Sequence, residues 1–153
     1  VGPPLGSLER RICGDLWDRL LDEGRIWCTG RLRLGEVASW AAGADLATMP
    51  SLDDGMANGL LEGMALGLCP VATEIFSDVI KDGENGLLVP SANQEALSLA
   101  LQELSTDRER VGRLRHAARN SMLERIPEIE GQAYLDLFRD VLRTKSKNSQ
   151  GIN

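Results

Sequence analysis

The sequence predicts an α/β protein in which short parallel strands alternate with helices. Apolar runs of about five residues are separated by segments with helical periodicity, and this alternation occurs four times along the chain. The runs are continuously apolar, as expected for strands that are covered on both faces. A Gly-rich turn at Asp54–Asn58 joins one run to the helix that follows it. In such sheets, ligands bind beyond the carboxyl ends of the strands.

The first predicted elements lie before residue 43. Apolar residues recur every four positions over Leu8–Leu21, which predicts an amphipathic helix, and Ser7 is a suitable cap. Arg25–Thr29 is a short apolar run between glycines and predicts a strand. Glu36–Ala42 predicts a short helix.

The remaining elements continue the alternation, and prolines mark the ends of two strands. The turn residues at Asp82–Gly86 separate two of these elements. We expect one partial domain over residues 1–143 and a disordered polar tail over residues 144–153. The predicted strands are Asp45–Met49, Val71–Thr73 and Leu87–Val89, and the predicted helical segments are Asn58–Leu66, Phe76–Ile80, Gln94–Leu104, Arg108–Glu124 and Glu128–Arg143.

Composition narrows the class of protein. The 153 residues are 42% hydrophobic and carry a net charge of −6, with scattered Lys and Arg, which argues against a nucleic-acid partner. No stretch approaches the roughly 20 apolar residues that a membrane span needs, and no signal-peptide pattern is visible. Cys28 and Cys69 fall in apolar runs, so we expect reduced core thiols and a cytoplasmic protein.

The turn at Asp54–Asn58 has the chemistry of an anion site. A strand, a Gly-rich turn and a helix together present free backbone N–H groups where a phosphate can bind. Asp54 and Glu62 would then lie on either side of that anion. Simpler interpretations remain open, because Asp54 can cap the helix, Glu62 can be a solvated helix residue, and Gly55 can serve the turn alone.

Four segments together resemble a known family. Pro50–Glu62, Met64–Gly67, Pro70–Thr73 and Asp82–Pro90 look like the C-terminal, donor-binding half of a retaining glycosyltransferase of the sucrose-synthase-like group. The resemblance extends over about Val1–Leu142. It implies a Rossmann-like parallel sheet with flanking helices, which is part of the C-terminal half of a GT-B fold, with strand order 3-2-1-4-5-6.

The resemblance also implies a substrate and a set of roles. The substrate would be a nucleotide-diphosphate sugar, and we expect no metal and no separate cofactor. Glu62 would accept hydrogen bonds from the ribose hydroxyls, and Asp54 would contact the sugar near the reacting carbon as the catalytic residue. The backbone of the turn would hold the diphosphate, and two further segments would border the nucleotide. The residues concerned are Gly55, Met56, Ala57 and Asn58 for the diphosphate, Arg31 and Leu32 for the nucleobase, and Gly2 beside the nucleotide.

Some positions depart from the family pattern. Asp54 stands where the family usually has Glu, and Ala57 stands where the family often has Gly. Glu74–Asp78 replaces a Gly-Gly loop that normally faces the acceptor. Arg31 can also be read with Arg33 as an exposed basic pair.

The family's Gly-Arg turn, its Lys-bearing segment and its N-terminal acceptor domain have no counterpart in these residues. We therefore expect an N-terminally incomplete domain that is inactive alone, because fixed cations stabilise the departing diphosphate. The strands at Arg25–Cys28 and Asp45–Thr48 would lose the neighbours between them and would pair directly, or the chain would form a homodimer.

Three functions follow from this reading of the sequence. The first is donor binding within a retaining glycosyltransferase, whose acceptor site would come from another domain. The second is a non-catalytic descendant that binds a nucleotide, a sugar or a protein partner. The third is an unrelated α/β phosphate-binding enzyme, such as a sugar epimerase or a phosphatase, although no Gly-x-Gly-x-x-Gly motif or metal cluster supports it.

Overall fold

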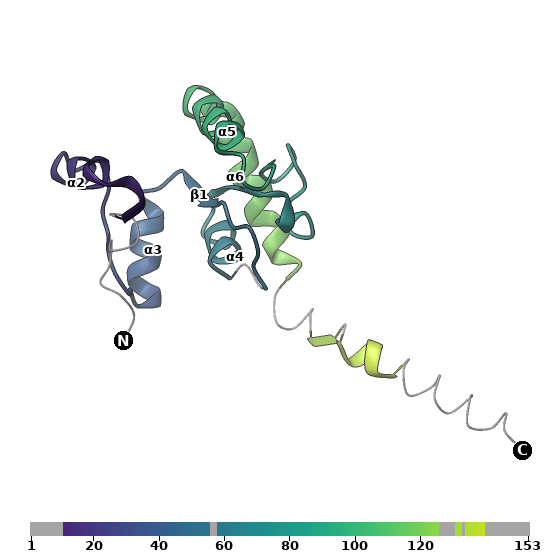
Figure 1. Cartoon of the computed structure of the whole chain (residues 1–153). Coiled ribbons are helices and arrows are strands. Elements are labelled where there is room, and N and C mark those ends of the chain that lie inside the picture. Colours follow the sequence, from purple (N-terminus) through teal and green to yellow (C-terminus); the bar gives the residue numbers. More distant parts are fainter. Residues whose placement is uncertain (1–10, 56–57, 126–130, 133, 140–153) are drawn as a thin grey trace, which may run out of the picture. The chain divides into compact units, whose positions relative to one another are not determined.

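The computed structural model describes residues 11–55, 58–125, 131–132 and 134–139 (Figure 1). The chain divides into two compact units, Val1–Trp40 and Ala41–Asn153. Each unit is described by itself below.

The first unit contains helix α2 (Asp15–Asp22) and most of helix α3 (Leu34–Ala42). The continuous helix predicted over Leu8–Leu21 is wrong, because Gly14 has a φ of 53° and interrupts it before α2. A left-handed residue of this kind suits glycine and cannot continue an α-helix. At the start of α3, the Arg33 N–H donates to Glu36 Oε2 at 2.7 Å, which satisfies one of the free donors of the first turn.

The strand predicted at Arg25–Thr29 is absent from the structure. The N–H groups of Arg25 and Ile26 both donate to the Leu20 carbonyl, at 2.9 and 3.3 Å, so the backbone turns back onto the end of α2. Trp27 is 69% exposed and Cys28 is exposed, so Cys28 is not a core thiol as predicted. An apolar run becomes a strand only when a neighbouring strand accepts its ladder of hydrogen bonds. The described sheet accordingly contains no strand from this segment, and the alternative of a homodimer stays a prediction.

The second unit contains a three-stranded parallel sheet in the order β1-β2-β3. The strands are β1 (Leu46–Met49), β2 (Cys69–Thr73) and β3 (Leu87–Val89), and each agrees with a predicted strand to within two residues. All five residues of the central strand are buried. This burial explains the continuous apolar run from which the strand was predicted.

The helical segment predicted at Phe76–Ile80 is wrong, because the structure has a 3₁₀ turn at Glu74–Phe76 that shares only Phe76 with it. The three α-helices between residues 58 and 123 follow the prediction. Side-chain caps fix two of them, because Asn93 Oδ1 accepts the Ala96 N–H and Asp107 Oδ1 accepts the Arg110 N–H. Residues 131–132 and 134–139 are helical, and the rest of the helix predicted at Glu128–Arg143 lies outside the described residues, as does the tail at 144–153. The elements are α4 (Asn58–Ala65), the 3₁₀ turn η1 (Glu74–Phe76), α5 (Gln94–Thr106) and α6 (Arg108–Leu123).

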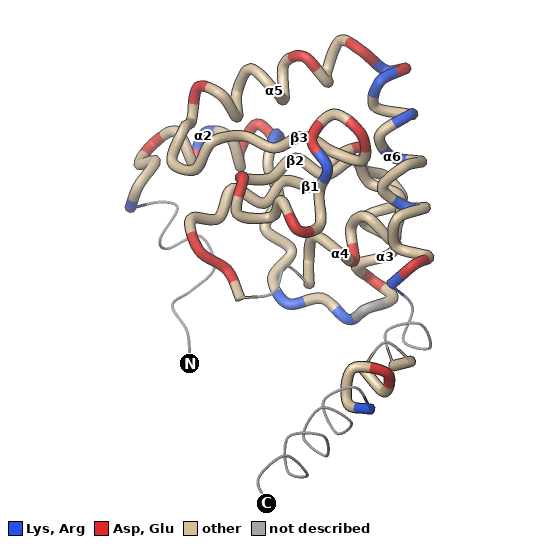
Figure 2. The backbone as a smooth tube through the Cα atoms, turned by 90° about the vertical axis from the view of Figure 1, so that its right-hand side faces the viewer, with Lys and Arg blue, Asp and Glu red and all other residues tan. Residues whose placement is uncertain are grey.

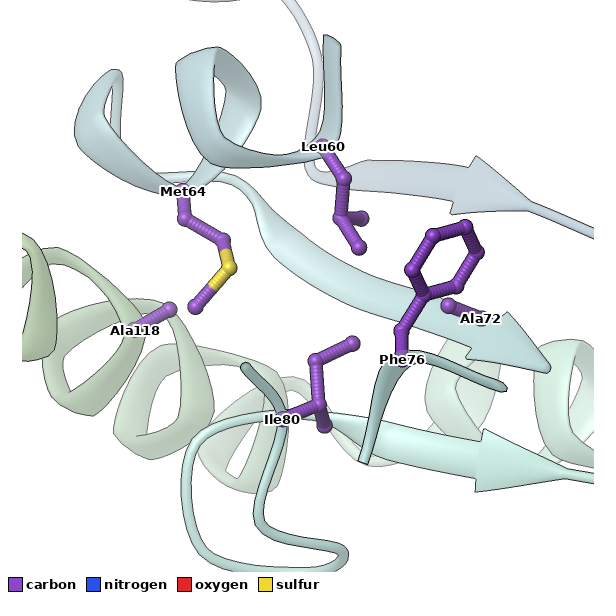
Figure 3. Packing of buried hydrophobic residues seen from close by; sticks show 6 residues of the cluster. All are labelled: Leu60, Met64, Ala72, Phe76, Ile80 and Ala118. Atoms are coloured by element: carbon purple, nitrogen blue, oxygen red, sulfur yellow. The ribbon is translucent and has the colours of Figure 1, made fainter. Parts of the chain in front are cut away.

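Two apolar clusters cover opposite faces of the sheet. Successive strand residues point to opposite faces, so Val71 and Ala72 belong to different clusters. Leu60 and Met64 of α4 pack with Ala72 on one face, where the side chains of Figure 3 point toward one another. Helix α5 covers the other face, and Figure 1 shows α4 and α5 on either side of β1. The first cluster is Leu60, Met64, Ala72, Phe76, Ile80 and Ala118, and the second is Cys69, Val71, Leu87, Leu104, Val111 and Leu114.

Helix α6 covers the amino ends of the strands. Asp45, just before β1, accepts hydrogen bonds from Arg108 at 2.6 Å and from Arg115 at 3.1 Å. Arg115 Nε also donates to the Gly67 carbonyl at 2.7 Å, just before β2. Figure 2 shows the basic residues of α6 spaced along its length. The carboxyl ends of the strands lie at the opposite edge of the sheet, away from these contacts.

Gly86 and Gly112 form a matched pair for testing this packing. A Cβ on Gly86 would lie 2.5 Å from Pro70 Cγ and 2.9 Å from the Pro70 carbonyl oxygen. Gly86→Ala should therefore destabilise the fold by about 1–3 kcal/mol. A Cβ on Gly112, in the exposed middle of α6, meets nothing within 4 Å, so Gly112→Ala should stabilise by about 0.5–1 kcal/mol. Urea unfolding measures the free energy of unfolding of both variants. Equal changes in the two variants would contradict the close approach at Gly86.

The contacts of Asp45 predict a pH effect. The hydrogen bond from Arg108 lowers the pKa of Asp45 below its ordinary value of 3.8, and the charges of Arg108 and Arg115 act in the same direction against partial desolvation. A lowered folded-state pKa means that the stabilisation is complete above pH 3.8 and is lost as the pH falls below it. Asp45→Asn should reduce stability near neutral pH, flatten this acid limb and weaken the salt dependence of stability. Superimposable urea-unfolding profiles for both proteins across pH would contradict this role.

Candidate functional site

Hydrogen bonds link the loops at the carboxyl ends of all three strands. The Thr73 hydroxyl, at the end of β2, donates to the Ser51 carbonyl in the loop after β1 at 2.6 Å. The Ser91 N–H, just after β3, donates to Glu74 Oε1 at 3.2 Å, and Glu74 directly follows β2. Thr73 is only 2% exposed, so its hydroxyl needs this partner. Segments distant in the sequence are thereby held together at the edge where ligands bind in parallel α/β sheets.

The start of α4 presents two of the predicted binding residues on one face. Asn58 is the first residue of α4 and Glu62 follows four positions later, a spacing that places both on the same side of a helix. Both are exposed, whereas Leu60 and Met64 are buried against the sheet. Glu62 is therefore accessible one turn into a helix that begins at the carboxyl edge.

Gly55 and Asp54 are exposed in the loop that leads to α4. A Cβ on Gly55 would meet nothing within 4 Å among the described residues, and its φ does not lie in the left-handed region. Among the described residues, neither a steric contact nor a left-handed φ therefore requires glycine at this position. An open approach to the backbone at the mouth of a helix is what an anionic ligand would use.

The other predicted site residues belong to the first unit or lie outside the described residues. Arg31 is exposed and Leu32 is half-buried, and both belong to the first unit. Gly2, Met56 and Ala57 lie outside the described residues. Their roles stay predictions.

A pocket of about 240 Å³ opens at the carboxyl edge of the sheet. Pro50 and Leu52 contribute to it from the loop after β1, and Thr73 and Val89 come from the ends of β2 and β3. The rest of the lining comes from the turn between β3 and α5 and from the first turns of α5. None of the described residues that line the pocket carries a charge. The lining residues from the turn and from α5 are Pro90, Ala92, Asn93, Gln94 and Leu97.

The turn between β3 and α5 is the part of this edge that sequence reasoning missed. Ala92 has a φ of 57°, which is the left-handed region and is uncommon for a residue with a side chain. The Ser91 hydroxyl is buried and makes no hydrogen bond to the described residues. Such strain and unsatisfied groups concentrate at binding sites. The available signal was the position of this segment, which follows a parallel strand and ends in a helix cap at Asn93.

The backbone of Ala92 predicts an unusual effect of glycine. A left-handed conformation costs alanine about 1–2 kcal/mol, whereas glycine adopts it freely at an entropic cost of about 0.5–1 kcal/mol. Ala92→Gly should therefore stabilise the protein slightly, by up to about 1 kcal/mol. The same exchange at Ala117, within α6, should destabilise by about 1 kcal/mol. Chemical unfolding gives the sign of the change in the free energy of unfolding for each variant. A loss of stability in both variants would contradict the strain at Ala92.

The described residues offer neither a cluster of metal ligands nor a membrane span. Among them, no three His, Cys, Asp or Glu side chains are grouped so that they could hold a metal ion. In the same residues, every helix is too short or too polar to reach across a bilayer.

Comparisons with known proteins agree with the geometry. The family described as "Glycosyl transferases group 1" matches residues 5–107. A curated relative, the D-inositol 3-phosphate glycosyltransferase of Paenarthrobacter aurescens (strain TC1), is 38% identical over 84 residues, which cover 52% of this chain and 21% of the relative. The chain thus spans about a fifth of that relative's length.

Solved structures show the same fold. Sucrose-phosphate synthase from Thermosynechococcus elongatus superimposes with a TM-score of 0.72 at 25% identity, over 91% of this chain and 37% of that one. A mutant of TarM from S. aureus, solved in complex with Fondaparinux, alpha-GlcNAc-glycerol and UDP, has a TM-score of 0.68 at 20% identity, over 82% of this chain and 27% of its own.

The Rossmann-like α/β arrangement of a GT-B glycosyltransferase, expected from the sequence, is confirmed. The family match covers more than half of the chain and includes β1, the Gly-rich turn, α4 and the residues that line the pocket. The chain therefore belongs to the glycosyl transferases group 1 family.

Proposed function

We propose that this chain is the donor-binding part of a retaining glycosyltransferase and binds a nucleotide-diphosphate sugar. The observation that carries the proposal is the exposed pair of Asn58 and Glu62 on one face of α4, at the carboxyl edge of a parallel sheet. The open backbone at Gly55 adds a second feature at the same edge. Membership of the family supplies the reaction class, which is sugar transfer.

Glu62 is suited to hold a ribose. A carboxylate offers several acceptor sites, so two neighbouring hydroxyls can donate to it at once. Its exposure leaves those acceptor sites accessible to a ligand. Hydrogen bonds to a charged acceptor are stronger than neutral ones, so this contact would contribute substantially to nucleotide affinity.

The diphosphate would lie at the beginning of α4. The first N–H groups of a helix lack partners within the helix, and the helix dipole places partial positive charge there. Asn58 is the first helical residue, and Gly55 allows close approach just before it. Met56 and Ala57 would complete this contact as part of the same proposal.

Asp54 would contact the sugar near the carbon that reacts. It lies in the loop held by Thr73, between the pocket residue Leu52 and the start of α4. Aspartate is one methylene shorter than the glutamate of the family pattern. Placement at the level of about 1 Å strongly affects rate in such sites, so this residue would set the efficiency of transfer.

The rest of the active site would come from other parts of the protein. Arg31 and Leu32 would border the nucleobase, and Gly2 would lie beside the nucleotide. The acceptor would bind to a separate domain. The TarM structure contains UDP, which is the kind of nucleotide that a donor of this class would carry. A second candidate is a non-catalytic nucleotide- or sugar-binding domain, which the shorter carboxylate at Asp54 favours over full activity.

A thermal-shift series with UDP, GDP and ADP tests the proposal. A ligand at about ten times its Kd stabilises the folded state by about 1.4 kcal/mol, which raises Tm by about 3–6 °C for a chain of this size. Glu62→Gln keeps the size of the side chain but removes its charge, so the shift should largely disappear.

Glu84→Gln is the matched control, because Glu84 is an exposed glutamate in the turn before β3, at the amino edge. The control should retain the full shift. No shift with any of the three nucleotides, or an equal shift in both variants, would overturn the assignment of Glu62. Binding without sugar transfer in the full-length protein would favour the non-catalytic candidate.

A further inference from the structure

The chain contains two Asn-Gly pairs, and the structure places them in opposite environments. Asn58 and Gly59 begin α4, whereas Asn85 and Gly86 lie in the turn before β3. We propose that Asn58 is a site of spontaneous deamidation and that its conversion switches off nucleotide binding at α4. The modification does not depend on the proposed function, whereas its effect on nucleotide binding rests on it.

An asparagine that precedes glycine can lose its side-chain amide without an enzyme. The backbone nitrogen of the glycine gives its proton to hydroxide and attacks the side-chain carbonyl carbon of the asparagine. The new C–N bond closes a succinimide ring, and the side-chain nitrogen leaves as ammonia. Water then opens the ring at either carbonyl, which leaves aspartate or isoaspartate. Glycine favours the reaction because it has no Cβ to hinder the attack and its backbone rotates freely.

The reacting groups of Asn58 and Gly59 are accessible. Both residues are exposed, and the Asn58 side chain makes no hydrogen bond to the described residues. The Gly59 N–H belongs to the first turn of α4, where the N–H groups lack partners within the helix. No described residue outside α4 accepts this N–H either. The backbone must rotate at Asn58 before the nitrogen reaches the side chain, and fraying at a helix end permits this rotation while the core stays packed.

The second pair is protected by its contacts. Asn85 is only 7% exposed, its Oδ1 accepts the Lys81 N–H at 2.8 Å, and its Nδ2 donates to the Ser121 hydroxyl at 3.3 Å. The side-chain amide is therefore fixed. Gly86 lies against Pro70 so closely that a Cβ would be 2.5 Å from Pro70 Cγ, which leaves its backbone little room to rotate. Deamidation at this pair therefore requires local unfolding.

Conversion of Asn58 changes the charge where the diphosphate would lie. Either product carries one more negative charge, so the chain becomes more acidic than its formal net charge of −6. The added carboxylate repels a nucleoside diphosphate at the start of α4. Isoaspartate also adds a methylene to the backbone, which displaces the first N–H groups of the helix. Aspartate at a helix N-terminus interacts favourably with the helix dipole, so loss of binding need not weaken the fold.

Peptide mass spectrometry of the aged chain tests the modification. The whole chain is kept in mildly alkaline buffer and then cleaved with trypsin, which cuts after Arg33, Lys81 and Arg108. The two Asn-Gly pairs fall in separate peptides, and Asn58 is the sole asparagine of its own peptide. Digestion in water labelled with heavy oxygen marks any conversion that occurs during the digestion. A second sample is aged in urea, where both pairs are exposed.

In the folded chain, Asn58 should convert at least about a hundredfold faster than Asn85, because a buried turn opens rarely in the native state. In urea the two should convert at similar rates. Gly59→Ala should slow the conversion strongly, and its Cβ makes only an ordinary contact with Met49 Cε at 3.5 Å, so the fold accommodates it. Gly112→Ala makes the same exchange within α6 and should leave the rate at Asn58 unchanged. Equal rates at both pairs in the folded chain, an Asn58 that converts only in urea, or an undiminished rate in Gly59→Ala would overturn the site.

Nucleotide binding by the fresh and converted chains tests the switch. Anion exchange separates the more acidic converted form, and calorimetry compares both forms with whichever of UDP, GDP and ADP binds the fresh chain. The converted form and Asn58→Asp should each bind at least about tenfold more weakly, which corresponds to about 1.4 kcal/mol. Asn120→Asp adds the same charge at an exposed residue of α6 and should not change the affinity.

The modification and the switch can fail separately. Equal affinity of the fresh and converted forms would overturn the switch while the proposed nucleotide site remains. A fresh chain that binds none of the three nucleotides would overturn the proposed function and the switch together. The peptide measurement decides the modification in either case, because it does not need the nucleotide.

Discussion

The hydrogen bond from the hydroxyl of the buried Thr73 to the Ser51 carbonyl is the contact on which the candidate site depends. It is 2.6 Å long and connects the end of the central strand to the loop that follows β1. If that loop moved away, a buried hydroxyl would lose its partner at a cost of about 1–3 kcal/mol. The loop therefore leaves the sheet from a fixed point. Leu52, Asp54 and the start of α4 follow from that point, so the pocket and the proposed nucleotide site share one anchor.

The two edges of the sheet have different chemistry, and this difference favours the carboxyl edge for the proposed ligand. At the amino edge, Asp45 and the Gly67 carbonyl are bound by arginines of α6, and Asn85 donates to Ser121 of the same helix at 3.3 Å. These contacts occupy the groups that an incoming ligand would need. At the carboxyl edge, the described structure leaves the face of Asn58 and Glu62 exposed and opens an uncharged pocket. The stabilising contacts of α6 and the proposed ligand site thus lie at opposite ends of the same strands.

Local signals explain where sequence reasoning succeeded. Leu87–Val89 was predicted with the bounds that the structure has, because turn residues precede it and Pro90 follows it. Helix α4 was predicted to within one residue from its Gly-rich entry and its apolar positions. The same approach failed at Arg25–Thr29, where composition favours a strand but the backbone bonds to the end of α2 instead. Strand formation depends on a distant partner, which composition does not reveal.

Some residues of the candidate site could likewise be predicted from the sequence, and others could not. The pairing of Asn58 and Glu62 follows from helical spacing, so it was readable from the sequence. The pocket depends on residues contributed by three strand ends and on the left-handed backbone at Ala92, and neither is encoded in a short motif. Arg31 and Leu32 were assigned through the family pattern alone, and their part in the site stays a prediction.

Nucleotide binding where α4 meets the carboxyl edge of the sheet can be observed residue by residue. The decisive experiment is an amide NMR titration of the chain with the nucleoside diphosphates UDP, GDP and ADP. We expect the backbone amides of Gly55, Asn58 and Gly59 to shift with at least one of them, while those of Glu84 and Asn85 at the amino edge do not. Shifts confined to the amino edge, or saturating binding that leaves Gly55 and Asn58 unchanged, would show that the nucleotide does not bind at α4.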